Sequence, residues 1–139
     1  LFEGEYLYNN KRKGKEYYNN GNLFFEGEYL FNKIWNGIIH DFNDNNIIYK
    51  INNGKGYIKE FKDNGKILFE GEYVNGVRNG KGKEYNYDGK IIFEGEYLNG
   101  KRWNGKGLLE DDHFEGEYLN GKNGMDVIMV LMLMIMIMN

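Results

Sequence analysis

The chain has 139 residues, a formal net charge of −3, 17% aromatic residues and 20 glycines. This acidic balance gives no general attraction to nucleic acid, so we expect no nucleic-acid partner. Serine, threonine and cysteine are absent, which excludes nucleophilic catalysis by their side chains. We therefore predict that the protein is not an enzyme and holds no cofactor.

A five-residue word, Phe-Glu-Gly-Glu-Tyr, recurs along the chain with spacings of 23, 44, 24 and 21 residues. The interval of 44 residues hides one further copy that has lost the word. Repetition at this period is typical of a stacked array, in which no unit buries its apolar face alone. The word begins at Phe2, Phe25, Phe69, Phe93 and Phe114.

One unit, residues 69–92, shows how the repeat is expected to fold. Residues 69–73 alternate in polarity, with aromatics and a glycine on one face and two glutamates on the other. Asn75-Gly76 then supplies the positive φ angles of a tight hairpin turn, and residues 80–83 return as a second strand. The glycines predict close packing under an aromatic ring of a neighbouring strand, and the glutamates lie across from lysines of the same hairpin. Glu84 and Tyr85 break the alternation, which requires a β-bulge.

The whole chain divides into six such units followed by an apolar tail. The second unit loses its lysines at residues 38–42 and the third lacks the five-residue word, although both keep the period and are expected to form hairpins. The units run near 2–24, 25–46, 47–68, 69–92, 93–113 and 114–124. Because Leu1 falls inside a repeat, we expect the sequence to be a fragment of a longer protein.

The tail, residues 125–139, is almost entirely Val, Ile, Leu and Met. Its apolar run is shorter than the roughly 20 residues that span a bilayer as a helix. Three interpretations stay open: a cap over the end of the array, a reading-frame slip in an Asn- and Asp-rich gene, and insertion into a membrane.

The segment 93–107, Phe-Glu-Gly-Glu-Tyr-Leu-Asn-Gly-Lys-Arg-Trp-Asn-Gly-Lys-Gly, resembles the MORN (membrane occupation and recognition nexus) repeat, in a variant form. The resemblance extends over most of residues 1–124. It implies an all-β fold, an elongated single-layer antiparallel sheet of consecutive hairpins. It also implies scaffolding, dimer formation and attachment near membranes, sometimes beside a lipid kinase domain.

The expected structural positions of the repeat are the aromatic residues and glycines of each unit. They are Phe2, Gly4, Tyr6, Phe25, Gly27, Tyr29, Phe69, Gly71, Tyr73, Gly80, Gly82, Phe93, Gly95, Tyr97, Gly105, Gly107, Phe114, Gly116 and Tyr118.

Two acidic segments are candidate metal sites, but neither is predicted to bind a metal ion. Residues 110–113, Glu-Asp-Asp-His, are adjacent in sequence, and no second group of ligands completes a shell. Residues 41–52 begin like a calcium loop, but Asn46 and Asn52 replace the glycine and the bidentate glutamate that such a loop needs.

Basic residues and two tryptophans fall in the hairpin loops and form the candidate binding positions. Regular strand spacing would align the cations in a row along one edge of the sheet, where each contributes about 1 kcal/mol near an anionic leaflet. The candidates are Lys11, Arg12, Lys13, Arg78, Lys101, Arg102, Trp35 and Trp103.

A stripe of phenylalanine and tyrosine rings on one face of the sheet is predicted to form a long exposed apolar surface, which monomeric proteins rarely leave uncovered. We therefore expect a protein partner, or a second copy in a homodimer, in the cytoplasm or at the cytoskeleton. Binding to anionic phospholipids or phosphoinositides at the membrane periphery is the alternative.

Overall fold

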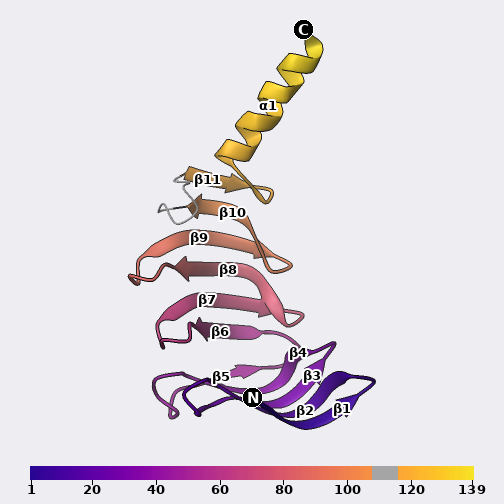
Figure 1. The fold of residues 1–139 in the computed structure, drawn as a ribbon, viewed down its shortest axis with the longest axis vertical. Coiled ribbons are helices and arrows are strands. Elements are labelled where there is room, and N and C mark those ends of the chain that lie inside the picture. The colour runs from indigo at the N-terminus through magenta and orange to yellow at the C-terminus, as the bar shows by residue number, and fades with distance from the viewer. Residues whose placement is uncertain (108–115) are drawn as a thin grey trace.

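The computed structural model describes residues 1–107 and 116–139, and most of this part of the chain is β-strand (Figure 1). Successive strands are joined by short turns into hairpins, so the predicted all-β architecture of consecutive hairpins is confirmed. The strands are β1 (Phe2–Leu7), β2 (Asn10–Tyr17), β3 (Leu23–Leu30), β4 (Lys33–His40), β5 (Ile48–Ile51), β6 (Gly56–Phe61), β7 (Ile67–Val74), β8 (Val77–Tyr85), β9 (Ile91–Leu98), β10 (Lys101–Gly107), β11 (Gly116–Leu119) and β12 (Lys122–Asn123). They are followed by one helix, α1 (Gly124–Met138).

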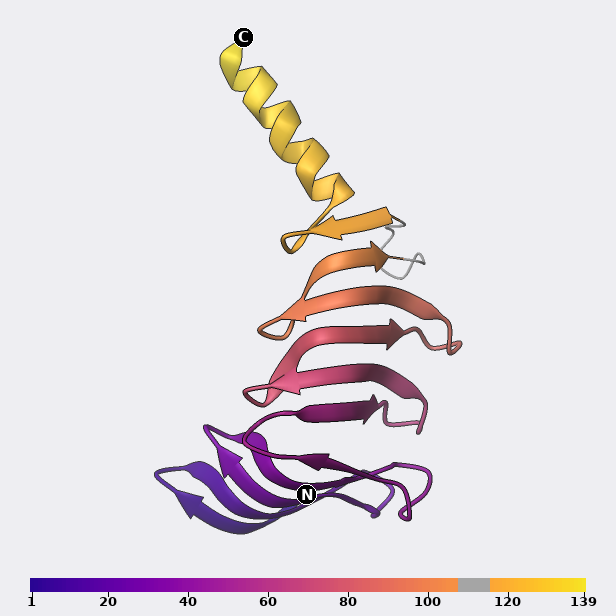
Figure 2. The ribbon, with the colours of Figure 1, turned by 180° about the vertical axis from the view of Figure 1, so that it is seen from behind.

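The strands form two antiparallel sheets, where the sequence predicted one. The first has the order β1-β2-β3-β4-β5 and the second the order β12-β11-β10-β9-β8-β7-β6. Between them, β5 and β6 share only the isolated bridge of Asn52 with Lys55. Figure 2 shows the two sheets following one another along the long axis of the molecule.

Tight turns with left-handed backbone at two successive residues close the hairpins. Asn75 and Gly76, with φ of 55° and 77°, form such a turn between β7 and β8, as the Asn-Gly pair predicts. The first two hairpins instead use Tyr8-Asn9 and Phe31-Asn32 in the same conformation. Bulky side chains rarely adopt this conformation.

A row of glycines runs across each sheet in register. In β7 and β8, Gly71 faces Gly82, and a Cβ atom added to Gly82 would lie 2.6 Å from the ring of Phe69. The aromatic ring therefore occupies the space that the glycine leaves free, as predicted, and it covers the glycine of its own strand as well. The rows consist of Gly4, Gly14, Gly27 and Gly37 in the first sheet and Gly71, Gly82, Gly95 and Gly105 in the second.

The sheet divides where two isoleucines interrupt the glycine rows. Ile51 is paired with Gly37, and Ile58 is paired with Gly71. Both isoleucines are buried and pack in one cluster. In the other hairpins, one phenylalanine ring lies over a pair of glycines; here two branched side chains fill that place. Side-chain packing, more than backbone pairing, therefore joins β5 to β6. The hairpin expected for residues 47–68 is therefore hydrogen-bonded at its turn, whereas β5 and β6 are not paired beyond the turn.

The phenylalanine and tyrosine rings form the core instead of an exposed stripe, so that prediction was wrong. Phe25, Phe69 and Phe93 are fully buried, and Tyr97 stacks edge-on against Phe69 and Phe93 at 5.2 Å between centroids. The strands bend (Figure 2), and basic side chains of the hairpins cover the rings from the open side. Tyr73 packs against both core clusters and so links the two sheets.

The expected bulge lies between Glu84 and Tyr85, where the register with β9 shifts. The extra residue is Ile92 of β9, between Phe93 and Ile91, so the alternation along β8 continues. Tyr85 therefore lies on the face that carries Glu70, and its hydroxyl donates a hydrogen bond to that carboxylate. Glu84 stays on the face of the aromatic core.

The helix α1 extends away from the second sheet (Figure 1). Its described apolar side chains, at positions 128–138, are between 43% and 84% exposed. Within the described residues, no helix is long and apolar enough to cross a bilayer.

Candidate interaction surfaces

Three of the predicted binding cations are engaged inside the fold. Arg78 donates from Nε and Nη2 to the two carboxylate oxygens of Glu60, at 2.8 and 2.9 Å. Its guanidinium also lies 4.3 Å from the centroid of Phe69. In the first hairpin, Lys11 lies 5.1 Å from the centroid of the equivalent ring, Phe2, and its Nζ is 2.6 Å from Glu16 of its own strand.

Arg102 repeats this arrangement one unit later. It donates from Nε and Nη2 to Glu84 at 3.0 and 3.1 Å, and from Nη1 to the hydroxyl of Tyr118 at 2.8 Å. Because Arg78 also approaches Glu84 at 3.5 Å, the charges alternate from one hairpin to the next. The predicted row of outward-facing cations is thus corrected at Lys11, Arg78 and Arg102.

Tyr29, Tyr73 and Tyr97, which pack in the aromatic core, each donate to a carboxylate of the preceding hairpin. The tyrosine lies thirteen residues after its acceptor, as in the pairs Tyr73 with Glu60 at 2.6 Å and Tyr97 with Glu84 at 2.7 Å. Burial, together with the nearby carboxylates, raises the pKa of both tyrosines far above the ordinary value. These phenols therefore serve as hydrogen-bond donors and are poor candidates for proton transfer.

Glu84 is held ionised by the same contacts. Burial alone would raise its pKa, but the hydrogen bonds from Arg102 and Tyr97, with the charges of Arg102 and Arg78, outweigh burial and lower it. The glutamates that sequence reasoning did not single out, Glu16, Glu60 and Glu84, are thus the partners of the expected binding cations. Each of these glutamates precedes a tyrosine of the repeat by thirteen residues, and this constant spacing was the signal in the sequence that could have identified them.

The two tryptophans pack against the turn of the following hairpin. The backbone oxygen of Trp35 accepts from Gly54 at 2.9 Å, and that of Trp103 accepts from Gly121 at 2.8 Å. A Cβ on Gly54 or Gly121 would collide with or crowd the indole ring. Both tryptophans are half-buried, so their contacts join neighbouring hairpins.

Exposed apolar residues gather at the tips of the first two hairpins, in what we call the tip patch: Leu7, Tyr8, Leu30 and Phe31. Tyr8 is 88% and Phe31 78% exposed. The four residues line a shallow hollow of about 330 Å³. In the later hairpins asparagine occupies the positions of Tyr8 and Phe31.

The remaining predicted cations are exposed, and two of them lie near this patch. Arg12 and Lys13 follow the first turn, Arg12 also lining the hollow, whereas Lys101 lies in the fifth hairpin. Sequence reasoning identified these cations but missed the aromatic tips, whose signal was an aromatic residue where later units have asparagine.

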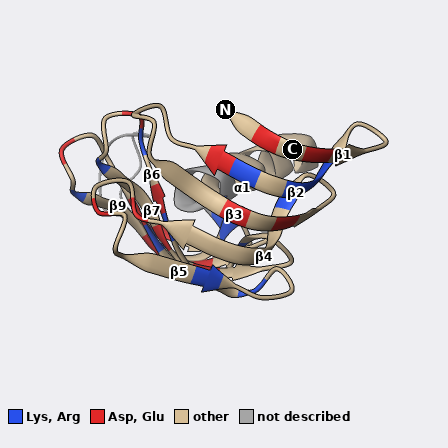
Figure 3. Cartoon of the chain, turned by 90° about the horizontal axis from the view of Figure 1, so that it is seen from below, with Lys and Arg blue, Asp and Glu red and all other residues tan. Residues whose placement is uncertain are grey.

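The face opposite the aromatic core, which we call the outer face, carries charges that alternate from strand to strand. Figure 3 shows positive and negative residues interspersed along the strands. Lys83 lies across from both Glu70 and Glu94 and forms its ion pair with Glu94 at 3.8 Å. In the second sheet the row is Lys59, Glu70, Lys83, Glu94, Lys106 and Glu117.

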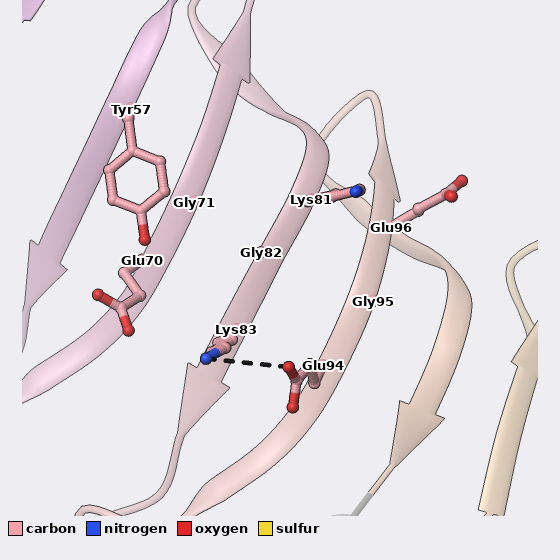
Figure 4. Close-up of a pocket in the computed structure, with 9 residues that line it drawn as sticks. All are labelled: Tyr57, Glu70, Gly71, Lys81, Gly82, Lys83, Glu94, Gly95 and Glu96. Carbon is pink, nitrogen blue, oxygen red and sulfur yellow. Dashed lines mark ion pairs between the residues drawn. The ribbon is translucent and has the colours of Figure 1, made fainter.

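A hollow of about 340 Å³ lies on this outer face, with Gly71, Gly82 and Gly95 in its floor (Figure 4). Carboxylates and ammonium groups both line it, and the Lys83–Glu94 pair crosses one side. Opposite charges in such proximity favour neither an anionic nor a cationic ligand, so the hollow offers no selective charge for a small molecule.

The candidate metal segments provide no assembled site within residues 1–107 and 116–139, where no three potential ligands converge. Asp41 is buried and accepts from the backbone of Asn43 at 2.9 Å, closing a local turn. His40 contacts the backbone oxygen of Asn45 at 3.2 Å through Nδ1. Residues 110–113 and Phe114 lie outside the described residues.

Comparison with known proteins identified no relative: no family model, curated protein or solved structure matches the chain.

Proposed function

We propose that the chain is a MORN-type array, an elongated single layer of strands, that serves as a non-catalytic module for protein assembly in the cytoplasm. Self-association through the tip patch is the first form of assembly to test. The resemblance of the repeats to MORN units supports the family, and the exposed tip patch supports the assembly role.

The observation that carries this proposal is the choice of residues at the first two turns. Tyr8 and Phe31 adopt φ angles of 49° and 50°, where asparagine is several-fold enriched and aromatic side chains are unfavourable. Burial of the aromatic rings does not offset this conformational cost, because both rings remain exposed. A binding role for the rings provides a reason for keeping them, since contiguous exposed apolar groups mark interaction sites.

The experiment compares the full chain with the double substitution Tyr8→Asn and Phe31→Asn by sedimentation velocity. These changes restore the residue that later hairpins use, so we expect the variant to fold with equal or greater stability and to self-associate more weakly. The control is Tyr87→Asn, because Tyr87 is 73% exposed at a turn remote in sequence. Self-association unchanged by the double substitution would contradict the proposed role of the tip patch.

Binding to anionic phospholipids is the second candidate, favoured by the exposed Arg12 and Lys13 beside the aromatic tips. In that case Arg12→Gln with Lys13→Gln would abolish sedimentation with phosphatidylserine-containing vesicles. Added salt would also weaken binding to these vesicles, because exposed charges are screened beyond about 8 Å at physiological ionic strength.

A further inference from the structure

A second kind of surface lies in the middle of the array, at the edge of the second sheet. It is a hollow between the β6–β7 connection, residues 62–66, and the β8–β9 connection, residues 86–90, and we call it the edge hollow. Figure 1 shows these two connections on the same edge, opposite the β7–β8 turn. The edge hollow has a volume of about 690 Å³, and small-molecule sites generally have roughly 300–1,000 Å³.

Two β-bulges supply much of its apolar lining. Leu68 is the extra residue where the register of β6 with β7 shifts, and Ile92 is the extra residue between β8 and β9. Both side chains line the edge hollow together with the rings of Phe61 and Tyr85, the last residues of β6 and β8. All four residues are partly buried, so the fold itself builds this apolar surface.

Tyr87 adds an aromatic ring that the local backbone does not require. The β8–β9 connection has the same pattern of backbone hydrogen bonds as the β2–β3 and β6–β7 connections. In those two connections Asn19 and Asp63 occupy the position of Tyr87. A polar residue therefore suffices for the turn, and the ring has another role.

The neighbouring connection holds this ring in place. The ammonium group of Lys62 lies 4.3 Å from the ring centroid of Tyr87, a distance at which the cation and the ring attract each other. Lys66 donates from Nζ to the backbone oxygen of Tyr87 at 3.0 Å. The ring is positioned by these contacts but stays 73% exposed, so most of it is available to a ligand.

Polar groups of the lining offer both donors and acceptors. Among the described residues, none forms a hydrogen bond or ion pair with the carboxylate of Asp63 or the hydroxyl of Tyr87. The side-chain oxygen of Asn64 accepts from the amide of Lys66 at 2.9 Å, and its amino group can donate outward. A carboxylate accepts, an amino group donates and a phenol does both.

We propose that the edge hollow binds a neutral saccharide. A sugar ring has an apolar face that packs on Tyr87 and the apolar lining, and hydroxyl groups that donate to Asp63 and accept from Asn64. Because an anion would meet Asp63 and a cation would meet Lys62, the lining favours an uncharged ligand. This site goes beyond the proposed assembly role and does not depend on it.

A proline-rich peptide is the other ligand that aromatic-lined grooves commonly accept. Proline has no backbone N–H, so such a peptide would cover the carboxylate of Asp63 without donating to it. Burying a carboxylate without a hydrogen bond is costly. Saccharide hydroxyls donate to that carboxylate, and the free acceptor therefore favours a saccharide.

The test titrates the isotope-labelled full chain with cellotriose, maltotriose and chitotriose, three neutral saccharides, and follows the amide signals by two-dimensional NMR. At least one of them is expected to shift the signals of residues 61–64 and 85–88 saturably. Added salt is expected to leave the affinity unchanged, because screening weakens charge pairs and this complex contains none between protein and ligand. A proline-rich peptide is titrated for comparison and is expected to leave these signals unshifted.

Substitutions at the site give the sharper test. Tyr87→Asn uses the residue found at position 19, so we expect an unchanged thermal unfolding midpoint but about fivefold weaker binding, which corresponds to about 1 kcal/mol of aromatic contact. Tyr87→Phe keeps the ring and is expected to retain most of the affinity. Asp63→Ala removes the acceptor and is expected to weaken binding as well.

The control is the tip-patch variant, Tyr8→Asn with Phe31→Asn, which is expected to bind the saccharide as the unchanged chain does. Its self-association reports on assembly alone, so failure of either proposal is recognised separately. Absence of shifts with all three saccharides, shifts confined to other residues, unchanged affinity of the Tyr87→Asn variant, or binding of the proline-rich peptide at these residues would overturn the saccharide site.

Discussion

At the scale of single residues, the array depends on glycines and glutamates that serve the aromatic core. The glycines leave room for rings such as Phe69, and the glutamates accept hydrogen bonds from tyrosine and arginine of the next hairpin. Arg78 and Arg102 cover the rings while pairing with these glutamates. A cation in a repeat loop is therefore no evidence of an anionic ligand until its internal partners are known.

A substitution in the glycine row tests this packing. Gly82→Val places a side chain where even a Cβ would lie 2.6 Å from Phe69 and 3.1 Å from Tyr97. We expect the free energy of unfolding to fall by about 1–3 kcal/mol, as for overpacked cores, measured by urea denaturation. The control is Gly89→Asn, where no atom lies within 4 Å and asparagine tolerates the φ of 80°. Equal losses at both positions would contradict packing as the role of the row.

At the scale of elements, each hairpin joins the next through backbone pairing, ring stacking and a turn contact. The fourth hairpin accommodates an additional residue before Gly82, with Gly80 at a φ of 101° and the carboxylate of Glu72 accepting from the amide of Lys81 at 2.8 Å. The β5–β6 hairpin differs more, because its strands share only the bridge of Asn52 with Lys55. Fewer inter-strand residue pairs hold this junction than hold β7 to β8.

Native-state hydrogen exchange measures that difference. We expect the amides of β5 and β6 that face each other to exchange several-fold faster than those between β7 and β8, since local opening follows the loss of backbone pairing. Mass spectrometry of peptides covering residues 48–61 and 67–85 would report it. Uniform protection across both regions would mean that β5 and β6 are paired as closely as the other hairpins.

At the scale of the whole molecule, α1 is the part with the least contact to the rest. It adjoins β11 and β12 at its start and exposes its described apolar side chains on all sides. The interpretation of this segment as a cap over the end of the array stays a prediction, and association through its exposed apolar side chains is the other role to test. Contiguous exposed apolar surface of this kind promotes association.

Polar substitution of α1 distinguishes these roles. Leu131→Lys with Ile135→Lys changes two residues on one helical face, 52% and 59% exposed. We expect weaker association by light scattering and an unchanged thermal unfolding midpoint for the array. A lowered midpoint would show that α1 covers the end of the array. Adding the two lysine substitutions to the Tyr8→Asn and Phe31→Asn variant separates association through α1 from association through the tip patch.

The repeat and its local structure can be predicted from the order of neighbouring residues. Alternation, the Asn-Gly turns and the bulge at Glu84 follow from properties of neighbouring residues, so they could be predicted for residues 69–92 and extended to most of the array. The ring over Gly82 could also be predicted, because a glycine inside a strand needs a neighbour that uses the space.

Which surfaces are free depends on contacts between hairpins that the order of neighbouring residues does not reveal. The rings of Phe69 and Phe93 are buried because the strands bend and the arginines fold over them, and the arginines fold inward because glutamates from another hairpin pair with them. The division of the sheet at Ile51 and Ile58 likewise depends on packing between strands. Such contacts join residues 13 to 18 positions apart, so a strand pattern that specifies only the face of each side chain leaves its partner undetermined.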